Sequence, residues 1–406
     1  MADFARSAHP GVQEQLDRLP ALAPPGDRLG LERIAALLDR LGRPQDALPP
    51  VFHVAGTNGK GSTVAFLRAA IEASGHRVHV FTSPHLVRFN ERIRIAGTLI
   101  DDSTLAALLA EVLDSSGGIE PSFFEVATAA AFLAFARSPA DACLLEVGLG
   151  GRLDATNVVE RPLVTGIASI ALDHQHYLGP DIASIAREKA GIAKPGVPLV
   201  SVAQLKEAER VISEVAGERR APLLLEGRDW SVDPELEPAL AGAHQRRNAG
   251  LAWAMLSAQD AVAVPRDTFL RAVGQTRWPA RFQQLSDGPL TNGKATWIDG
   301  AHNAAAAAAL AGILADRGPM HIVLGILANK DAEAIVTALR PHALSLTFVP
   351  VPDHAHHDTG ELARRFGGRA SSSVEQALAD LPEPRLVAGS LYLAGAVLAA
   401  NGEVPD

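Results

Sequence analysis

The stretch VFHVAGTNGKGSTVAF, residues 51–66, indicates the fold of this chain. Residues 51–55 read as a buried strand, and STVAFLRAAIEAS (62–74) reads as a helix with Gly75 just past its end. A glycine-rich turn between a strand and a helix lets the backbone approach an anion, and the helix N-terminus offers free N–H groups. We therefore expect residues 56–63 to hold phosphate, with Lys60 reaching the terminal phosphates.

The spacing of this loop differs from that of the common phosphate loop. The pattern Gly-x4-Gly-Lys-Ser/Thr would place a glycine where this chain has Val54. In addition, Gly61 separates Lys60 from Ser62. A glycine-rich turn that binds no ligand is the alternative interpretation of this stretch taken alone.

Length and composition favour a two-domain protein of the cytoplasm. The chain has 406 residues, of which 47% are apolar and 20% charged, which is typical of globular proteins. The net charge is −9 and no basic stripe with interleaved aromatics occurs, so we expect no nucleic-acid partner. The single cysteine, Cys143, indicates a reducing compartment. Neither a secretory signal nor a membrane-spanning segment is expected.

Short apolar runs typical of strands alternate with helical patterns, which predicts an α/β fold with a doubly wound, mainly parallel sheet. The helical patterns lie at 31–41, 62–74, 122–136 and 244–258. The strand patterns lie at 51–55, 77–81, 142–147, 163–170, 198–202, 296–299, 321–326, 344–351 and 385–389. A turn-rich segment, QLSDGPLTNGKA (284–295), interrupts the alternation. We place the domain boundary there, which gives a first domain of 1–286 and a smaller α/β domain of 287–406.

The loop GTNGKGS (56–62) resembles that of the folylpolyglutamate synthase and dihydrofolate synthase family, within the wider Mur-ligase superfamily. Eight further stretches are similar to motifs of this family and occur in the same order. They are TSPHLVRFNERIRI (82–95), SFFEVAT (122–128), LEVGLGGRLDATN (145–157), SIALDHQHYLG (169–179), REKAGIAKPG (187–196), HQRRNA (244–249), PARFQ (279–283) and IDGAHN (298–303). The resemblance implies a Mur-ligase-like fold, in which an ATP-binding domain is followed by a smaller C-terminal ligase domain.

The resemblance also implies a set of residues that contact ATP. Arg281 suits a phosphate because its planar guanidinium makes two charge-assisted hydrogen bonds. Asp299 is expected to contact ATP from the second domain, across a cleft. The full set is Gly56, Thr57, Asn58, Gly59, Lys60, Gly61, Ser62, Thr63, Asn248, Arg281, Asp299 and His302.

Two magnesium sites are expected. Glu146 ends a predicted strand near the phosphate loop, where a carboxylate is well placed to hold Mg²⁺. The resemblance implies that Ser83 joins Glu146 at the first site. It also implies that His174 binds the second metal together with Lys189, carbamylated by carbon dioxide. Without the resemblance, Ser83 would be interpreted as a helix cap, His174 as a structural histidine and Lys189 as a solvated lysine. With the resemblance, the catalytic groups are Lys60, Lys189, His174 and Arg281.

The pteridine-bearing substrate is expected at two stretches, Ser122, Phe123, Phe124 and Glu125, and Leu153, Asp154 and Ala155. One of the two phenylalanines is expected to be ordinary helix core. The stretch LGLERI (29–34), preceded by the Pro- and Gly-rich LPALAPPGDR (19–28), resembles the mobile N-terminal segment that folds over the pterin in bifunctional relatives. A further cluster, His354, His356 and His357 in 351–362, does not fit the family, and a surface loop is favoured there over a metal site.

The expected reaction is ATP-dependent ligation of L-glutamate to dihydropteroate and to reduced folates, through an acyl phosphate, by a monomer. Three alternatives stay open: only one of the two activities, a ligase acting on a cell-wall nucleotide precursor, or a nucleotide-binding switch without ligase chemistry. Only about fifty residues precede the loop strand, which argues against the cell-wall ligase, because such relatives carry an additional N-terminal domain.

Overall fold

The computed structural model of the chain describes residues 7–19 and 29–406. They divide into two compact units. The first contains the chain up to Ala239 and Gln245–Thr276, and the second contains Leu240–His244 and Arg277–Asp406. Of the segment expected to fold over the pterin, residues 20–28 lie outside the described residues, whereas residues 29–34 are described and lead into the helix that begins at Glu32.

The first unit is built on a sheet with the strand order β4-β3-β2-β5-β1-β6-β7-β8. From β2 to β8 the neighbouring strands are parallel, whereas β3 and β4 form an antiparallel edge. The strands are β1 (Val51–Ala55), β2 (Val78–Phe81), β3 (Ile93–Ile95), β4 (Thr98–Leu99), β5 (Ala142–Glu146), β6 (Val164–Ile167), β7 (Leu199–Ser201) and β8 (Leu223–Leu225).

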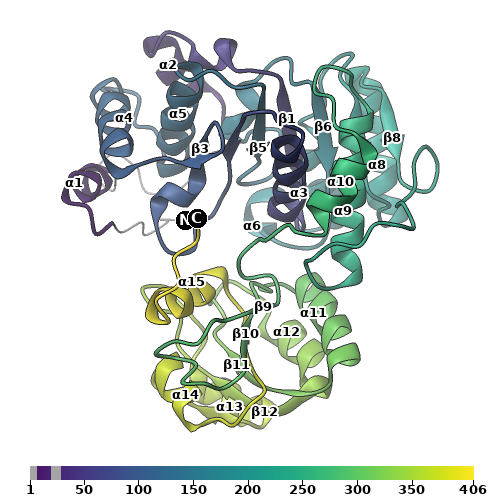
Figure 1. The fold of residues 1–406 in the computed structure, drawn as a ribbon. Helices are drawn as coiled ribbons and strands as arrows, with labels where there is room; N and C mark the ends of the chain where they lie inside the picture. The colour runs from purple at the N-terminus through teal and green to yellow at the C-terminus, as the bar shows by residue number, and fades with distance from the viewer. Residues whose placement is uncertain (1–6, 20–28) are drawn as a thin grey trace. The chain divides into compact units, whose positions relative to one another are not determined.

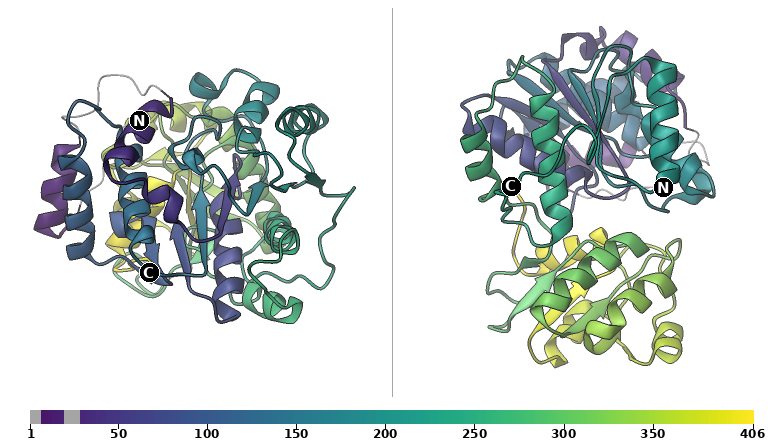
Figure 2. Two further views of the ribbon diagram at one scale, coloured as in Figure 1. Left: turned by 90° about the horizontal axis from the view of Figure 1, so that it is seen from above. Right: turned by 90° about the vertical axis from the view of Figure 1, so that its right-hand side faces the viewer.

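Helices cover both faces of this sheet (Figures 1 and 2). The two ends of β1 reach two different hydrophobic core clusters. Val51 packs into a core with α1, α2, α4 and α5, and Ala55 packs into one with α7 and α8. The helix α3 contacts β1, β2 and β5, and α10 packs on it. The helices are α1 (Pro10–Arg18), α2 (Glu32–Arg40), α3 (Lys60–Ala73), α4 (Asp102–Asp114), α5 (Phe123–Ala136), α6 (Gln175–Leu178), α7 (Ile182–Ala190), α8 (Lys206–Arg219), α9 (Ala243–Ser257) and α10 (Arg266–Val273).

The second unit has its own sheet, in the order β13-β12-β11-β14-β10-β9, with only β9 antiparallel to its neighbour among the described strands. The helices α11 and α12 pack on one face, and α14 and α15 contact β11 and β14. The strands are β9 (Gln283–Gln284), β10 (Thr296–Ile298), β11 (Met320–Leu324), β12 (Ala343–Phe348), β13 (Arg369–Ala370) and β14 (Arg385–Ala388). The helices are α11 (Ala304–Arg317), α12 (Ala332–Leu339), α13 (Thr359–Phe366), α14 (Val374–Asp380) and α15 (Leu391–Ala400).

The predicted α/β fold with doubly wound, mainly parallel sheets is confirmed, and each predicted strand forms. The units divide between Thr276 and Arg277, so the boundary predicted at 286/287 falls inside the second unit. The reason is β9, which pairs with β10 and thereby joins the second sheet ahead of the turn-rich segment. Within the described residues, no helix has the length and apolarity needed to cross a membrane.

A buried arginine holds one end of the second unit. Arg385 is 1% exposed. It donates to the carbonyl oxygens of Thr291, Lys294 and Leu378, and to Thr296 Oγ1, at 2.6–3.2 Å. All of these acceptors are uncharged, so the guanidinium acts by satisfying buried oxygens.

Arg385→Met should therefore destabilise the second unit, by about 3 kcal/mol, because several buried oxygens lose their donor while the apolar stem is kept. Urea unfolding followed by circular dichroism measures the change. Arg369→Met is the matched control, since Arg369 is exposed on the edge strand β13 and donates to one hydroxyl. Equal stability of the two variants would contradict this role.

Candidate active site

The phosphate loop joins β1 to α3 as predicted. Gly56 and Gly59 have φ values of 150° and 92°, which L side chains rarely adopt. No side chain caps the N-terminus of α3, so its first N–H groups face the loop. The Nζ atom of Lys60 lies 3.2 Å from Gly56 O and 3.4 Å from Thr57 O. Ser62 Oγ is buried and meets no hydrogen-bond partner among the residues described. The loop thus combines a cation with an unsatisfied hydroxyl.

Thr57 and Asn58 tie the loop to the chain after β6. The N–H groups of both residues donate to Ser169 O, at 2.8 and 3.3 Å. Thr57 Oγ1 donates to Ala171 O and accepts from Ala171 N, at 3.0 Å each. Thr63 Oγ1, one turn into α3, donates to Gly59 O at 2.9 Å. These side chains therefore brace the loop, which brings the segment leading to His174 beside it.

Lys189, near the end of α7, is buried, with 4% of its surface exposed. Its Nζ atom donates to Gly56 O at 2.9 Å, the same oxygen that accepts from Lys60. Burial, and next the charge of Lys60, lower the pKa of the Lys189 amine to about 7. The ordinary reading of Lys189 as a solvated surface lysine is wrong. A large fraction of this amine is neutral at physiological pH.

His174 and Asp173 follow β6. His174 has a φ of 52°, a left-handed conformation that costs a non-glycine residue about 1 kcal/mol. Its N–H donates to Asp173 Oδ1 at 2.8 Å, and its Nε2 lies 3.9 Å from the same oxygen. The negative charge of Asp173 also acts on Lys189, where it raises the pKa. Asp173 was missed by the sequence reasoning, although it stands directly before His174 in a motif that was singled out.

Glu146 and Ser83 lie together at the carboxyl ends of neighbouring strands. Glu146 is the last residue of β5 and is 5% exposed, and Ser83 follows β2. The backbone N–H of Ser83 donates to Glu146 Oε2 at 3.2 Å. Parallel strands present their carboxyl ends at one edge of the sheet, which is where ligands bind in such folds. The phosphate loop leaves β1 at this same edge, between β5 and β6.

Asn248, on α9, packs directly on the loop. Its side chain is buried, and its Nδ2 donates to Gln245 Oε1 at 3.1 Å. A Cβ atom on Gly59 would lie 2.3 Å from Asn248 Oδ1, so only glycine fits at that position. Asn248 therefore lies beside the loop in the first unit, and its contact with ATP stays a prediction.

The loop from Gly148 to Thr156 is organised by a buried carboxylate. Asp154 Oδ2 accepts from the N–H groups of Gly148 and Leu149, at 3.0 and 2.9 Å. Asp154 Oδ1 accepts from Thr156 N at 3.0 Å and from Thr156 Oγ1 at 2.5 Å. Burial raises the pKa of the Asp154 carboxyl, and these hydrogen bonds oppose that shift. Leu153 is partly buried and Ala155 is buried. A direct contact of Asp154 with substrate stays a prediction.

Ser122 and Glu125 cap the N-terminus of α5. Ser122 N donates to Glu125 Oε2 at 2.6 Å, and Glu125 N donates to Ser122 Oγ at 3.3 Å, a reciprocal capping box. Arg33 of α2 also donates to Glu125 Oε2, at 3.1 Å. Glu125 Oε1 is buried without a hydrogen-bond partner among the described residues.

Phe123 and Phe124 are both half-buried and contribute to the same core. The Phe123 ring lies edge-on to Phe89, with the Arg92 guanidinium 5.2 Å from its centroid. The Phe124 ring packs on Phe81 at 5.7 Å. Both rings pack against this core and stay partly exposed, so the expectation that one of the two is only helix core stays a prediction.

Three residues predicted to contact ATP lie in the second unit. Arg281 precedes β9, and Asp299 and His302 follow β10. Asp299 follows β10 and accepts from Phe282 N and Ala301 N, at 2.8 Å each. Burial raises the pKa of the Asp299 carboxyl, while the charge of Arg281 lowers it. Arg281 Nη1 donates to Ala280 O at 2.9 Å, and His302 Nδ1 lies 2.8 Å from Gly300 O.

The histidine cluster lies on a loop of the second unit. His354 stacks on Tyr392 with centroids 3.9 Å apart. His356 Nδ1 lies 2.8 Å from the His354 carbonyl oxygen, and His357 Nε2 lies 2.8 Å from that of Lys330. Across 7–19 and 29–406, no three His, Cys, Asp or Glu side chains gather in a metal-binding arrangement.

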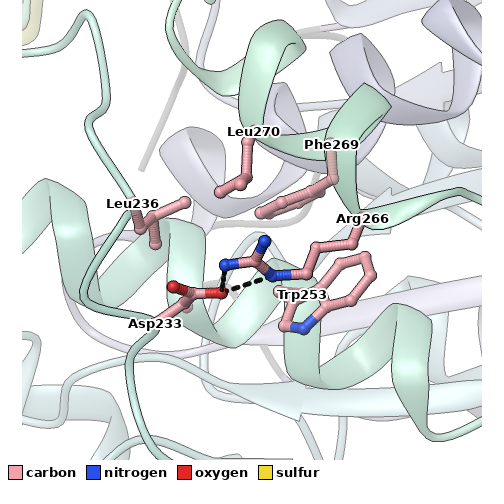
Figure 3. A pocket seen from close by; sticks show the side chains of 7 residues that line it. Asp233, Leu236, Trp253, Arg266, Phe269 and Leu270 are labelled. Carbon is pink, nitrogen blue, oxygen red and sulfur yellow. Dashed lines mark hydrogen bonds and ion pairs between the residues drawn. The ribbon is translucent and has the colours of Figure 1, made fainter.

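A hollow between α9 and α10 lies apart from all of these residues (Figure 3). Arg266 donates to Asp233 at 2.8 Å at its rim, and Trp253 and Phe269 pack at 4.9 Å between ring centroids. None of the predicted site residues lines it.

No protein-family model matches the chain. Comparison with known proteins nevertheless finds clear relatives. The chain is 36% identical over 356 residues to a dihydrofolate synthase/folylpolyglutamate synthase of Bacillus subtilis, covering 80% of this chain and 81% of the relative. Among solved structures, it is similar to Escherichia coli FolC in complex with DHPP and ADP, with a TM-score of 0.86, 33% identity and 97% of each chain covered.

A second solved structure is a bifunctional folylpolyglutamate synthase/dihydrofolate synthase with Mn, AMPPNP and L-glutamate bound. It has a TM-score of 0.85 and 32% identity, with 96% of this chain and 97% of that chain covered. The likeness extends over both units, since 97% and 96% of this chain are covered in the two comparisons. The chain belongs to the folylpolyglutamate synthase and dihydrofolate synthase family.

Proposed function

We propose that this protein is an ATP-dependent ligase that joins L-glutamate to dihydropteroate and to folates that already carry glutamate. One observation carries the proposal: two lysine amines, Lys60 and Lys189, converge on the carbonyl oxygen of Gly56 at the phosphate loop. The first keeps a cation at the phosphates. Burial and the charge of Lys60 lower the pKa of Lys189 to about 7. The neutral amine that results is the form that reacts with carbon dioxide.

The chemistry follows from the need to activate a carboxylate. Direct amide formation in water is uphill at neutral pH, so the substrate carboxylate first attacks the γ-phosphorus of ATP. ADP leaves, and an acyl phosphate forms. The amine of glutamate then attacks the acyl carbon, loses a proton, and phosphate departs. In this scheme Lys60 and Arg281 stabilise the negative charge that spreads over the transferring group.

The donor set fits a divalent cation. Ser62 Oγ is a buried hydroxyl without a partner in the described residues, and Glu146 is a carboxylate at the edge where the loop begins. Glu146 and Ser83 would hold one Mg²⁺, and His174 with carbamylated Lys189 a second. Such ions neutralise phosphate charge when bound. The two-site arrangement, a monomeric state and a reducing, cytoplasmic setting are parts of the proposal.

The pterin end is assigned to Phe123 and Phe124 with the loop from Leu153 to Ala155. Aromatic faces at the start of α5 suit a flat, partly polar ring. The backbone of the Asp154 loop supplies polar groups next to Gly148, which packs on Phe124. The acid is expected to lie with its carboxylate toward the phosphate loop.

A substrate panel tests the function. Purified protein, ATP and Mg²⁺ should release ADP only when L-glutamate and an acceptor are both present, and both dihydropteroate and a reduced folate monoglutamate should serve. Lys60→Ala protein is the background control. Activity with the folate alone would leave a dedicated polyglutamate synthase. Turnover with a cell-wall nucleotide precursor and an amino acid, or ADP release without any acceptor, would overturn the assignment.

A further inference from the structure

We infer that His53 and Thr156 are positioning residues that hold the loop beneath Phe124, and so set the affinity for the pteridine-bearing acid. The inference rests on the proposed function. Neither residue belongs to the predicted site. His53 lies in the middle of β1 and is fully buried, and its Nε2 atom lies 2.8 Å from Thr156 Oγ1. Thr156 sits in the short turn that follows Asp154.

The direction of each hydrogen bond from His53 through Thr156 to Asp154 can be assigned. Burial raises the pKa of the Asp154 carboxyl, but Oδ2 accepts from two N–H groups and Oδ1 accepts from Thr156 N, and this set of donors favours the ionised form. The Thr156 hydroxyl, 2.5 Å from Asp154 Oδ1, therefore donates to it. A hydroxyl that gives its proton away accepts from its other partner, so His53 carries its proton on Nε2. The relay runs from His53 through Thr156 to Asp154.

Burial fixes the protonation state of the histidine. Loss of solvent, and next the charge of Lys194, lower the pKa of His53 to about 3. The ring is therefore neutral, with one proton to donate. Its Nδ1 atom has no partner in the part of the chain that the structure describes. The hydrogen bond to Thr156 is then the interaction that orients the ring.

His53 is a costly choice for its position. The other residues of β1, Val51, Phe52, Val54 and Ala55, are all apolar and buried. The unsatisfied Nδ1 atom of a buried histidine costs roughly 1–3 kcal/mol of stability. A leucine or valine at this position would avoid that cost. A polar side chain that reduces stability in a strand core is expected to serve another purpose.

The far end of the relay reaches the predicted substrate wall. Asp154 holds the N–H groups of Gly148 and Leu149, which fixes how closely that turn approaches α5. A Cβ atom on Gly148 would lie 2.5–2.9 Å from three carbons of the Phe124 ring, so the ring rests on the glycine backbone. A shift of the turn would therefore shift Phe124. The phosphate loop is braced separately, through Thr57 and Ala171.

Two pairs of variants test the relay by steady-state kinetics. Thr156→Val and His53→Leu remove the hydrogen bond but keep the volume, and leucine suits a buried strand. Thr156→Ser keeps the hydroxyl, and His53→Gln places an amide nitrogen near the position of Nε2. His53→Leu should raise KM for the acid about tenfold, the effect of one lost hydrogen bond, and Thr156→Val at least as much, because it also removes the bond to Asp154 Oδ1. In both variants kcat and the KM for ATP should change by less than about twofold. Thr156→Ser and His53→Gln should keep KM for the acid close to the wild-type value.

The double variant His53→Leu/Thr156→Val should be no worse than Thr156→Val alone, because Thr156→Val already removes the bond that His53→Leu removes. Equal KM values for the acid in all variants, with lower melting temperatures in the first pair, would show that the relay serves the fold alone and would overturn the inference. Additive effects of the two substitutions would also overturn it.

Hydrogen exchange separates this inference from the proposed function. The amides of Gly148 and Leu149, measured in the substrate-free protein, should exchange faster in Thr156→Val and His53→Leu, but not in Thr156→Ser or His53→Gln. That result supports the relay even for a protein that fails the substrate panel. Unchanged exchange in all four variants would refute the relay while leaving the ligase assignment untouched.

Discussion

Lys60→Ala should abolish glutamate-dependent ADP release while leaving the fold intact. The expected loss in kcat is at least about a hundredfold, because the substitution deletes a charge that stabilises the transferring phosphoryl group. The fold should tolerate it, since among the described residues the ammonium donates to two loop carbonyl oxygens, at 3.2 and 3.4 Å. ADP production and thermal melting are to be measured on the same preparation.

The matched control for this variant is Lys206→Ala, at the exposed first residue of α8. It should retain wild-type turnover. Near-normal activity in a well-folded Lys60→Ala protein would show that the loop does not cradle phosphate.

Lys189→Ala should be almost as damaging, because one metal loses an acidic ligand. Acetate or formate should restore part of the rate by occupying the space that the side chain leaves. Lys189→Arg should fail in either case, since a guanidinium does not lose its proton and so cannot take up carbon dioxide. Turnover is compared with and without the small carboxylate, and melting curves confirm that each variant folds.

The pKa of Lys189 gives this prediction a pH dependence. The amine is lowered to about 7, so it is mostly protonated below that pH and mostly neutral above it. Wild-type enzyme depleted of carbon dioxide should therefore regain activity on adding bicarbonate more fully at pH 8 than at pH 6. Full activity of Lys189→Arg, or no response to bicarbonate at either pH, would mean that the site needs a positive charge and not a carbamate.

The sequence predicted the loop and its strand-to-helix setting because these depend on local chemistry. The residues of β1 are apolar, glycine is needed at positive φ, and the pattern of α3 is periodic. The position of Glu146 at the carboxyl edge of the sheet could also be predicted, because Glu146 directly ends an apolar strand pattern. Short elements such as β3, β9 and β13 went unpredicted, because two or three residues carry no measurable periodicity.

Contacts between distant segments could not be predicted in the same way. That Lys189 is buried and shares an acceptor with Lys60 depends on α7 packing across more than a hundred residues of sequence. Likewise, the local signal at Asp154 is a carboxylate before a threonine, and only the folded chain shows that its oxygens are occupied by its own loop. The position of β9 moved the unit boundary for the same reason.

The burial of the single cysteine makes the chain a convenient chemical reporter. Cys143 lies in β5, between β2 and β1, with no exposed surface, and burial raises the pKa of its thiol. A maleimide or disulfide reagent can reach this sulfur only when the central sheet opens, so the rate of labelling measures how often that core comes apart. The folded protein should therefore not react with thiol-specific dyes, because its one cysteine is fully buried. A cysteine introduced at any exposed site will be the one thiol that reacts, without first removing the native residue.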